Sequence, residues 1–308
     1  MWQPPGEWEP VPGAGPGTAG LWRVPGRRHV IVKRLVRPLS GDLSRGTPSE
    51  SDPGAGGWWR READVVLAGA AAHCPAFVGP EALDVVEDAE GISIFFTEAT
   101  PAPVSQSEVA RAVGALAASG APELASGVRD QFGERLEALE RRGGWHHLLG
   151  SPVAGVAEAA WDNRNAFRRM LEAMPRGPAH GDLTRANVLR PTPAGVLAVD
   201  WAMYGHAPLG SDLGHWSLAV GRDVADLLGE FLTGAGGELA DGTPDEDGVL
   251  LTARTVALFT ALARADWAAD RLAREVGNNY GWQHPALHPH VRAVRRQGSV
   301  RALLGPVA

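Results

Sequence analysis

The stretch PAHGDLTRANVL, residues 178–189, most constrains how this chain can fold. A helix interior disfavours Gly and Asp, and a buried strand disfavours Asp and Asn, so neither accommodates the run His-Gly-Asp at 180–182 with Asn187 shortly after it. The stretch is therefore predicted to be a loop. A short apolar strand, GVLAVD, follows and ends in Asp200.

The spacing of these polar residues is suited to phosphoryl transfer. That reaction needs a carboxylate beside the acceptor hydroxyl and hard oxygen ligands for Mg2+. We expect Asp182 to supply the first, with Asn187 and Asp200 as the metal ligands. Taken singly, each residue has a plainer interpretation as a turn residue or a helix cap. Their joint occurrence in this order favours the catalytic interpretation.

Lys33 is the only lysine in a chain that has 29 basic residues, the rest being arginines. An ammonium group is a compact point charge, whereas guanidinium is a wide planar fork, so a site that needs a small cation at phosphate groups cannot accept arginine. A lysine retained by chance is the alternative, and its position decides between the two. Lys33 lies in HVIVKRL, a β-branched run predicted to be a strand.

The predicted secondary structure changes near residue 100, from mostly strands to mostly helices. The earlier part is predicted to be mostly strands, with a Pro/Gly/Ser-rich loop at 38–57 and a helical segment that carries Glu62. Ser105 and Glu108 then form a capping-box signal at a helix start. Later helices are predicted over residues 105–119, 128–142, 157–174, 211–233, 250–276 and 288–304.

The complete pattern, H-G-D-x-x-x-x-N followed by a strand ending in Asp, resembles that of the aminoglycoside phosphotransferase and choline kinase family. Gly181, where protein kinases have Arg, points to the branch that acts on small molecules. The resemblance implies an α+β, bilobal, protein-kinase-like fold. Its small antiparallel β-rich N-lobe is expected over residues 1–99, and its larger, mainly helical C-lobe over 100–308.

The same resemblance implies a nucleotide site in the N-lobe and an enzyme that uses ATP and Mg2+. Lys33 would hold the phosphates and pair with Glu62, as a strand lysine and a helix glutamate do in kinases. A Gly-rich loop would cover the phosphates, and a hinge near Thr97 to Ala99 would hold the adenine. The residues expected at the loop and the hinge are Gly15, Gly17, Thr18, Gly20, Glu98 and Ala99.

Composition limits the partners and the location. The net charge of −7 and the pI near 5.8 argue against nucleic-acid binding, which requires a basic surface. We expect a cytoplasmic protein without membrane segments, because the N-terminus lacks a secretory signal and the longest apolar stretch is interrupted by His and Pro. The sequence leaves open whether the chain is a monomer or a homodimer.

The acceptor is expected to be a hydroxylated small molecule, and an antibiotic inactivated by a resistance enzyme is the leading expectation. Residues 241–308 hold seven acids and eight arginines, which gives little support for a strongly cationic acceptor. A metabolic kinase for choline, a sugar, a nucleoside or an amino alcohol is the alternative. A protein kinase and a non-catalytic nucleotide-binding scaffold are the rival classes.

Overall fold

A computed structural model gives the fold of most of the chain. Two of the glycines expected over the phosphates, Gly15 and Gly17, lie outside the described residues, as does the loop at 38–57. The structure describes residues 2–13, 18–26, 29–37, 58–122, 124, 131–236, 246–277, 281–298, 300 and 303.

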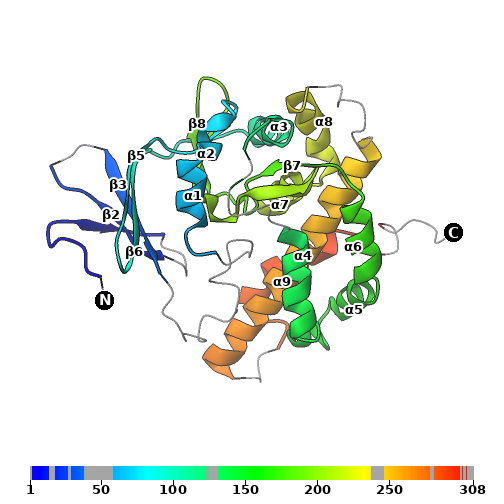
Figure 1. Cartoon of the computed structure of the whole chain (residues 1–308). Coiled ribbons are helices and arrows are strands. Elements are labelled where there is room, and N and C mark those ends of the chain that lie inside the picture. Colours follow the sequence, from blue (N-terminus) through cyan, green and yellow to red (C-terminus); the bar gives the residue numbers. More distant parts are fainter. Residues whose placement is uncertain are drawn as a thin grey trace.

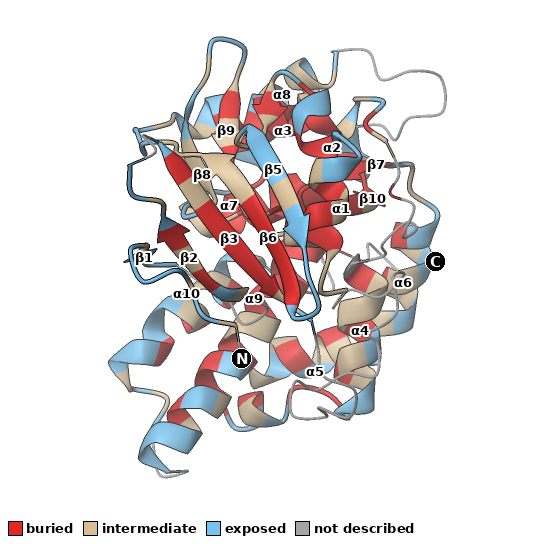
Figure 2. Cartoon of the chain, turned by 60° about the vertical axis from the view of Figure 1, so that its left-hand side comes forward, coloured by how far each residue is buried: buried red, intermediate tan, exposed pale blue. Residues whose placement is uncertain are grey.

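A five-stranded antiparallel sheet forms the N-terminal part, in the order β1-β2-β3-β6-β5 (Figure 1). Of the three inner strands, β3 and β6 are largely buried, whereas β5 at the edge is mostly exposed (Figure 2). Lys33 pairs with Ile94 in this register, in the third strand as the sequence predicts. The strands are β1 Glu9–Val11, β2 Thr18–Arg23, β3 Val30–Val36, β5 Ala82–Glu87 and β6 Gly91–Thr97.

The segment between β3 and β5 connects the sheet to the rest of the protein. Helix α1, Arg61–Leu67, contacts the short turn of 3-10 helix η4, Trp201–Met203. After α2, Ala70–His73, the strand β4, Phe77–Val78, pairs in parallel with β9, Val196–Ala198. Residues of this segment are therefore part of the same hydrophobic cluster as the helices that follow.

Helices dominate the C-terminal part, and α9 crosses its middle (Figure 1). The capping box of Ser105 and Glu108 at the start of α3 is confirmed, with both of its hydrogen bonds formed. The described helices are α3 Gln106–Ala117, α4 Gln131–Arg141, α5 Ala154–Asp162, α6 Arg164–Glu172, α7 Ser211–Val220, α8 Ala225–Gly234, α9 Glu246–Val276 and α10 His288–Arg296.

Two of the helices expected as single elements are each broken in two. The segment predicted as 211–233 is interrupted at Gly221, which ends α7 in the left-handed conformation with φ of 74°. Glycine adopts this conformation without a Cβ penalty, so it is a common helix end. The segment predicted as 157–174 breaks at Asn163, which separates α5 from α6.

Helix α9 is the single helix of the described residues that is long and apolar enough to cross a membrane. In its most apolar window, 67% of the residues are buried inside the protein. Its apolar residues pack against α7 and α10 and join a hydrophobic cluster of the helical part. The apolar composition of α9 is therefore that of a helix buried in the core.

Small residues allow α3 and α8 to pack closely. A Cβ added at Gly114 of α3 would overlap the carbonyl oxygen of Phe231, and one added at Gly234 of α8 would overlap that of Arg111. In both cases the obstacle is backbone, which cannot rotate away. The two glycines therefore set the separation of the helices.

Replacing Gly114 by Ala is expected to destabilise the fold by about 1–3 kcal/mol, the usual cost of overpacking a core. The matched control is Gly229→Ala in α8, where an added Cβ meets no atom within 4 Å. This control should gain about 0.5–1 kcal/mol, because Ala is the better helix former. Urea denaturation measures both variants, and equal effects would contradict the close packing.

Candidate active site

The predicted loop lies between two short strands. Strand β7, Arg176–Ala179, leads into it and pairs with β10, Gly205–Pro208, while β8, Val188–Pro191, leaves it and pairs with β9. Gly181 has φ of 83°, a backbone conformation that residues with a side chain seldom adopt. This conformation explains why glycine precedes the carboxylate.

His180 has a structural role in this loop. It is fully buried, and its ring packs against Phe77 and Trp201. Its Nε2 lies 3.0 Å from the carbonyl oxygen of Val199, and the Asp182 amide donates to its Nδ1 at 3.4 Å. The neutral imidazole protonated at Nε2 satisfies both contacts. His180 thereby links the loop to the end of β9.

Asp212 braces the same loop from the first turn of α7. Its two carboxylate oxygens accept hydrogen bonds from the backbone amides of His180 and Gly181, at 2.6 and 2.9 Å. Burial by itself would raise the pKa of Asp212, but its contacts with His215, His180 and the Gly181 amide outweigh burial and lower the pKa. An ionised carboxylate with both oxygens engaged therefore holds the backbone just before Asp182.

Asn187 and Asp200 offer oxygen atoms beside this loop. The Nδ2 of Asn187 donates to the carbonyl oxygen of Asp182 at 2.8 Å, so the amide oxygen points elsewhere. Asp200 is held in the left-handed conformation, with φ of 66°, and its side chain is 44% exposed. A non-glycine residue in this conformation stores strain, as is frequent at functional sites. An amide oxygen and a carboxylate suit Mg2+, with the remaining ligands left to water and phosphate.

Lys33 lies between two carboxylates from different parts of the chain. Its Nζ is 2.5 Å from Glu62 Oε2 and 2.7 Å from Asp200 Oδ1. Burial favours the neutral form of Lys33, but the negative charges of Glu62 and Asp200 outweigh it and keep the pKa above its ordinary value. Burial also raises the pKa of Glu62, an effect that Lys33 opposes. The structure thus brings together three of the predicted residues around one buried ammonium group.

Asp182 itself contacts an arginine from the distant helix α9. The Nη2 of Arg264 lies 3.6 Å from Asp182 Oδ1, and both side chains are about one-third exposed, at 35% and 37%. Arg135 of α4 donates to the carbonyl oxygen of Gly181 at 3.4 Å. The residue that is expected to act as base is therefore accessible to solvent and has cationic side chains beside it.

The remaining predicted residues lie in β2, just after β6 or beyond the described chain. Thr18 and Gly20 are in β2, separated by a bulge in their pairing with β3. Glu98, just after β6, donates its amide to the carbonyl oxygen of His29, and its carboxylate accepts from Arg23 at 2.6 Å. Ala99 follows it without regular structure.

Sequence reasoning did not include Arg135 and Arg264 among the site residues. Both lie in predicted helices of a chain with many arginines, and an arginine on a helix is usually a solvated surface charge. No local pattern distinguishes them, because their proximity to the loop depends on how α4 and α9 pack. Trp201, which follows Asp200 directly, is buried in the hydrophobic core.

Comparisons with known proteins show the family and the fold. The model of the phosphotransferase enzyme family matches residues 60–249, more than half of the chain. A comparison with curated protein sequences gives no match.

Solved structures share the fold at low sequence identity. Choline kinase LicA from Streptococcus pneumoniae is 15% identical with a TM-score of 0.57, covering 94% of this chain and 91% of its own. Amicoumacin kinase hAmiN, in complex with AMP-PNP, Ca2+ and Ami, is 10% identical with a TM-score of 0.58, covering 96% and 87%. Macrolide 2'-phosphotransferase MphH from Brachybacterium faecium is 15% identical with a TM-score of 0.51, covering 92% of each chain.

Replacing Asp212 by Asn should destabilise the protein by about 1–3 kcal/mol at pH 7, because the amide has only one oxygen to accept the two backbone N–H groups. The folded pKa of Asp212 lies below its unfolded value, so its contribution is complete above about pH 4 and is lost as the pH falls further. The stability difference between wild type and variant should therefore shrink below about pH 4. Urea midpoints at several pH values measure this, and a constant difference would be inconsistent with an ionised brace.

Proposed function

The chain belongs to the phosphotransferase enzyme family and is a small-molecule phosphotransferase that acts on hydroxyl groups; from this premise we propose that it transfers the γ-phosphate of ATP, with Mg2+, to a hydroxylated small molecule. The observation that carries the proposal is the position of Lys33 between Glu62 and Asp200, close to a loop that holds Asp182. We also propose that it acts in the cytoplasm.

In the proposed reaction, the acceptor oxygen attacks the γ-phosphorus and the bond from that phosphorus to the β–γ bridging oxygen breaks, which releases ADP. Asp182 orients the hydroxyl and takes its proton. The brace of Asp212 and the link through His180 hold the loop so that this carboxylate stays in place. Most of the rate gain comes from alignment and charge neutralisation.

The nucleotide site in this proposal is built around Lys33. Its ammonium group would contact the α- and β-phosphates while Glu62 keeps it in position. Asn187 and Asp200 would hold Mg2+, which, when bound, neutralises phosphate charge. The Gly-rich loop with Gly15, Gly17, Thr18 and Gly20 would cover the phosphates, and the backbone near Glu98 and Ala99 would face the adenine.

An antibiotic is the proposed acceptor, so that the enzyme would confer resistance. Two of the similar structures are named for antibiotics, amicoumacin and macrolides, and they support this choice. A metabolic kinase is the second candidate, which the likeness to a choline kinase supports. An ATP-consumption screen with hydroxylated antibiotics and metabolites, followed by mass detection of an added phosphate, distinguishes the two. Stabilisation by Mg-ATP without consumption of ATP across the panel would favour a nucleotide-binding scaffold instead.

Replacement of Asp182 by Asn should lower kcat by about 10²–10⁴-fold, the usual contribution of a general base, because the amide cannot take the proton. Mg-ATP binding should persist. Asp200→Ala should instead weaken Mg-ATP binding itself, since it removes a metal ligand. Steady-state kinetics and calorimetric titration of Mg-ATP separate the two effects. Mild and equal losses in both variants would refute these assignments.

Lys33→Arg should be as inactive as Lys33→Met, although it conserves the charge. The gap between Glu62 and Asp200 holds a single ammonium group within 2.7 Å of both carboxylates, and a planar guanidinium is too wide for it. The KM for ATP and kcat should be measured for both variants, with circular dichroism as the check on folding. Activity of the arginine variant close to that of wild type would show that the site does not require lysine.

A further inference from the structure

Arg264 of α9 forms an ion pair with the proposed base. Its Nη2 lies 3.6 Å from Asp182 Oδ1, which is close enough for charge attraction and too long for a hydrogen bond. The two side chains are 35% and 37% exposed, so both face solvent as well as each other. A guanidinium carries five N–H donors, and a contact at this distance uses none of them. Arg264 can therefore face Asp182 and bind a second anion.

The helix that carries Arg264 offers it no competing carboxylate. Side chains three and four positions apart share one face of a helix. Asp266 lies off the face of Arg264, and its carboxylate accepts a hydrogen bond from the His147 amide at 3.0 Å. Along α9, all of which the structure describes, the positions that share the face of Arg264 at this spacing are Thr260, Ala261, Trp267 and Ala268.

The imidazoles on which the charge of Arg264 acts are neutral. Burial lowers the pKa of His215 in α7, and the charges of Arg135 and Arg264 lower it further. Burial likewise lowers the pKa of His290 in α10, with the charges of Arg264 and Arg271 acting in the same direction. Near neutral pH both rings are uncharged, so the positive charge on this side of the loop is that of arginine side chains.

The loop has a cation of its own, but that cation is bound elsewhere. Arg185 lies between Asp182 and Asn187 in the sequence. Its Nε and Nη2 donate to the carbonyl oxygens of Ala219 and Val220 at the end of α7, at 3.1 and 3.2 Å. A cation at a helix C-terminus is stabilised by the helix dipole. Arg185 thus attaches the loop to α7.

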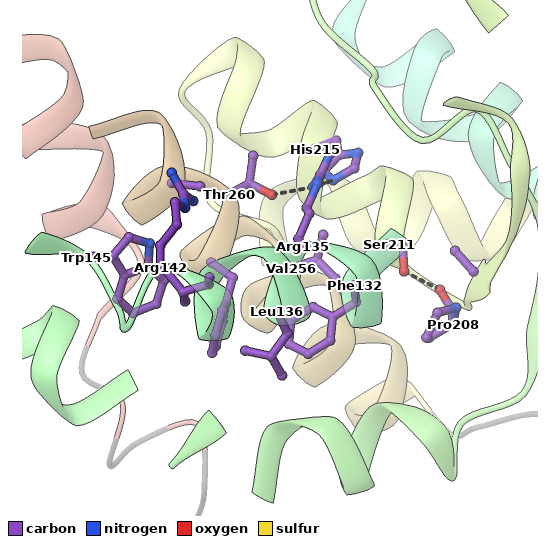
Figure 3. A pocket seen from close by; sticks show the side chains of 14 residues that line it. Phe132, Arg135, Leu136, Arg142, Trp145, Pro208, Ser211, His215, Val256 and Thr260 are labelled. Atoms are coloured by element: carbon purple, nitrogen blue, oxygen red, sulfur yellow. Dashed lines mark hydrogen bonds between the residues drawn. The ribbon is translucent and has the colours of Figure 1, made fainter. Parts of the chain in front are cut away.

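Arg135 of α4 is engaged in the interior of the helical part. It lies in the wall of a small cavity that α4, α9 and the segment 207–211 line (Figure 3). Its Nη1 is 3.0 Å from both the Thr260 hydroxyl and His215 Nε2, and its Nη2 donates to the carbonyl oxygen of Gly181. Arg135 therefore supports the loop backbone, whereas Arg264 faces the carboxylate.

The proposed reaction needs positive charge on both sides of the phosphoryl group that moves. In the proposed site, Lys33 faces the α- and β-phosphates and Mg2+ is held by Asn187 and Asp200, so these charges lie on the nucleotide side. A general base lies about 2.6–3.2 Å from the hydroxyl that it deprotonates, and the reacting atoms are about 3–3.5 Å apart. The transferred phosphorus therefore passes within about 7 Å of the Asp182 carboxylate, which Arg264 faces.

We propose that Arg264 is a catalytic residue that neutralises the transferred phosphoryl group from the acceptor side. The proposal rests on the proposed phosphotransfer and adds a residue to it. The hydroxyl proton goes to Asp182, the bond from the acceptor oxygen to phosphorus forms and the bond to ADP breaks. Arg264 gives up no proton and forms no covalent bond. Its charge offsets the charge on the oxygens of the moving group, and an arginine in this role raises kcat by about 10³–10⁵-fold in other enzymes.

Fluoroaluminate tests the proposal by binding, without an acceptor. Beside ADP it imitates the phosphoryl group in transit, and calorimetry of the whole protein compares the affinity for Mg-ADP with and without it. Wild type should bind Mg-ADP about 10²-fold more tightly with fluoroaluminate, the lower end of the range for transition-state analogues. Arg264→Ala should lose at least about tenfold of this gain, whereas its affinity for Mg-ADP alone should not change. A full gain in Arg264→Ala, or no gain in wild type, would overturn the proposal.

Matched variants assign the effect to Arg264. Arg254→Ala is the control on the same helix, because Arg254 is 37% exposed and pairs with Asp223 at 3.4 Å. It should keep the whole gain from fluoroaluminate. Arg264→Lys should keep part of the gain, since it conserves the charge without the planar fork. Urea denaturation checks folding, and Arg264→Gln replaces the alanine variant if that one does not fold. Equal losses of the gain in the Arg264 and Arg254 variants would count against the assignment.

The same titrations distinguish failure of this inference from failure of the proposed function. If wild type does not bind Mg-ADP, the proposed function fails and the inference fails with it. If wild type binds Mg-ADP and gains affinity from fluoroaluminate as strongly as Arg264→Ala does, the function stands and the inference is wrong. If Arg264→Ala weakens Mg-ADP binding equally with and without fluoroaluminate, Arg264 acts on the nucleotide site as a whole, and the inference is again wrong.

Discussion

The ion pairs of Lys33 are the interaction on which the arrangement of the site depends. One ammonium group joins β3 in the sheet, α1 beside it and the end of β9 in the helical part, through Glu62 and Asp200. Since Glu62 is almost completely buried, removal of the lysine would leave a carboxylate without compensation in a region of low dielectric. Replacing Lys33 would therefore remove its ion pairs and also disturb the positions of β3, α1 and the end of β9 relative to one another. This dependence also accounts for a lysine in a chain that otherwise uses arginine.

A second set of contacts holds the loop rather than the cation. The backbone before Asp182 is fixed from both sides, by the carboxylate of Asp212 on α7 and by the imidazole of His180 on the loop itself. The carboxylate of Asp182 takes no part in this support and stays about one-third exposed. Rigid support of the backbone combined with an accessible side chain is the arrangement that positioning of a reactant requires. Close packing of α3 on α8 and the buried α9 supply the frame behind it.

Much of the fold and of the site could be predicted from local sequence, and the reason differs from one feature to the next. The 180–187 loop was recognisable because Gly, Asp and Asn are poor in both helices and strands, and the third strand because it is rich in β-branched residues. The breaks at Gly221 and Asn163 were not predicted, although Gly and Asn are both common where helices end. Arg264 was not predicted because a helical arginine looks the same in sequence whether it faces solvent or a carboxylate.

The sequence by itself determined the fold class, the order of the elements and the set of charged and amide side chains that a phosphotransferase needs, because these depend on residue type and on spacing within short segments. Tertiary structure decided which of them meet: that Lys33 lies between two carboxylates, that Asp212 supports the loop, and that Arg264 reaches Asp182. It also decided that α4, α9 and the segment 207–211, which lie far apart in the chain, line one cavity. Contacts between residues far apart in the chain follow from packing of whole helices, and no short stretch of sequence records that packing.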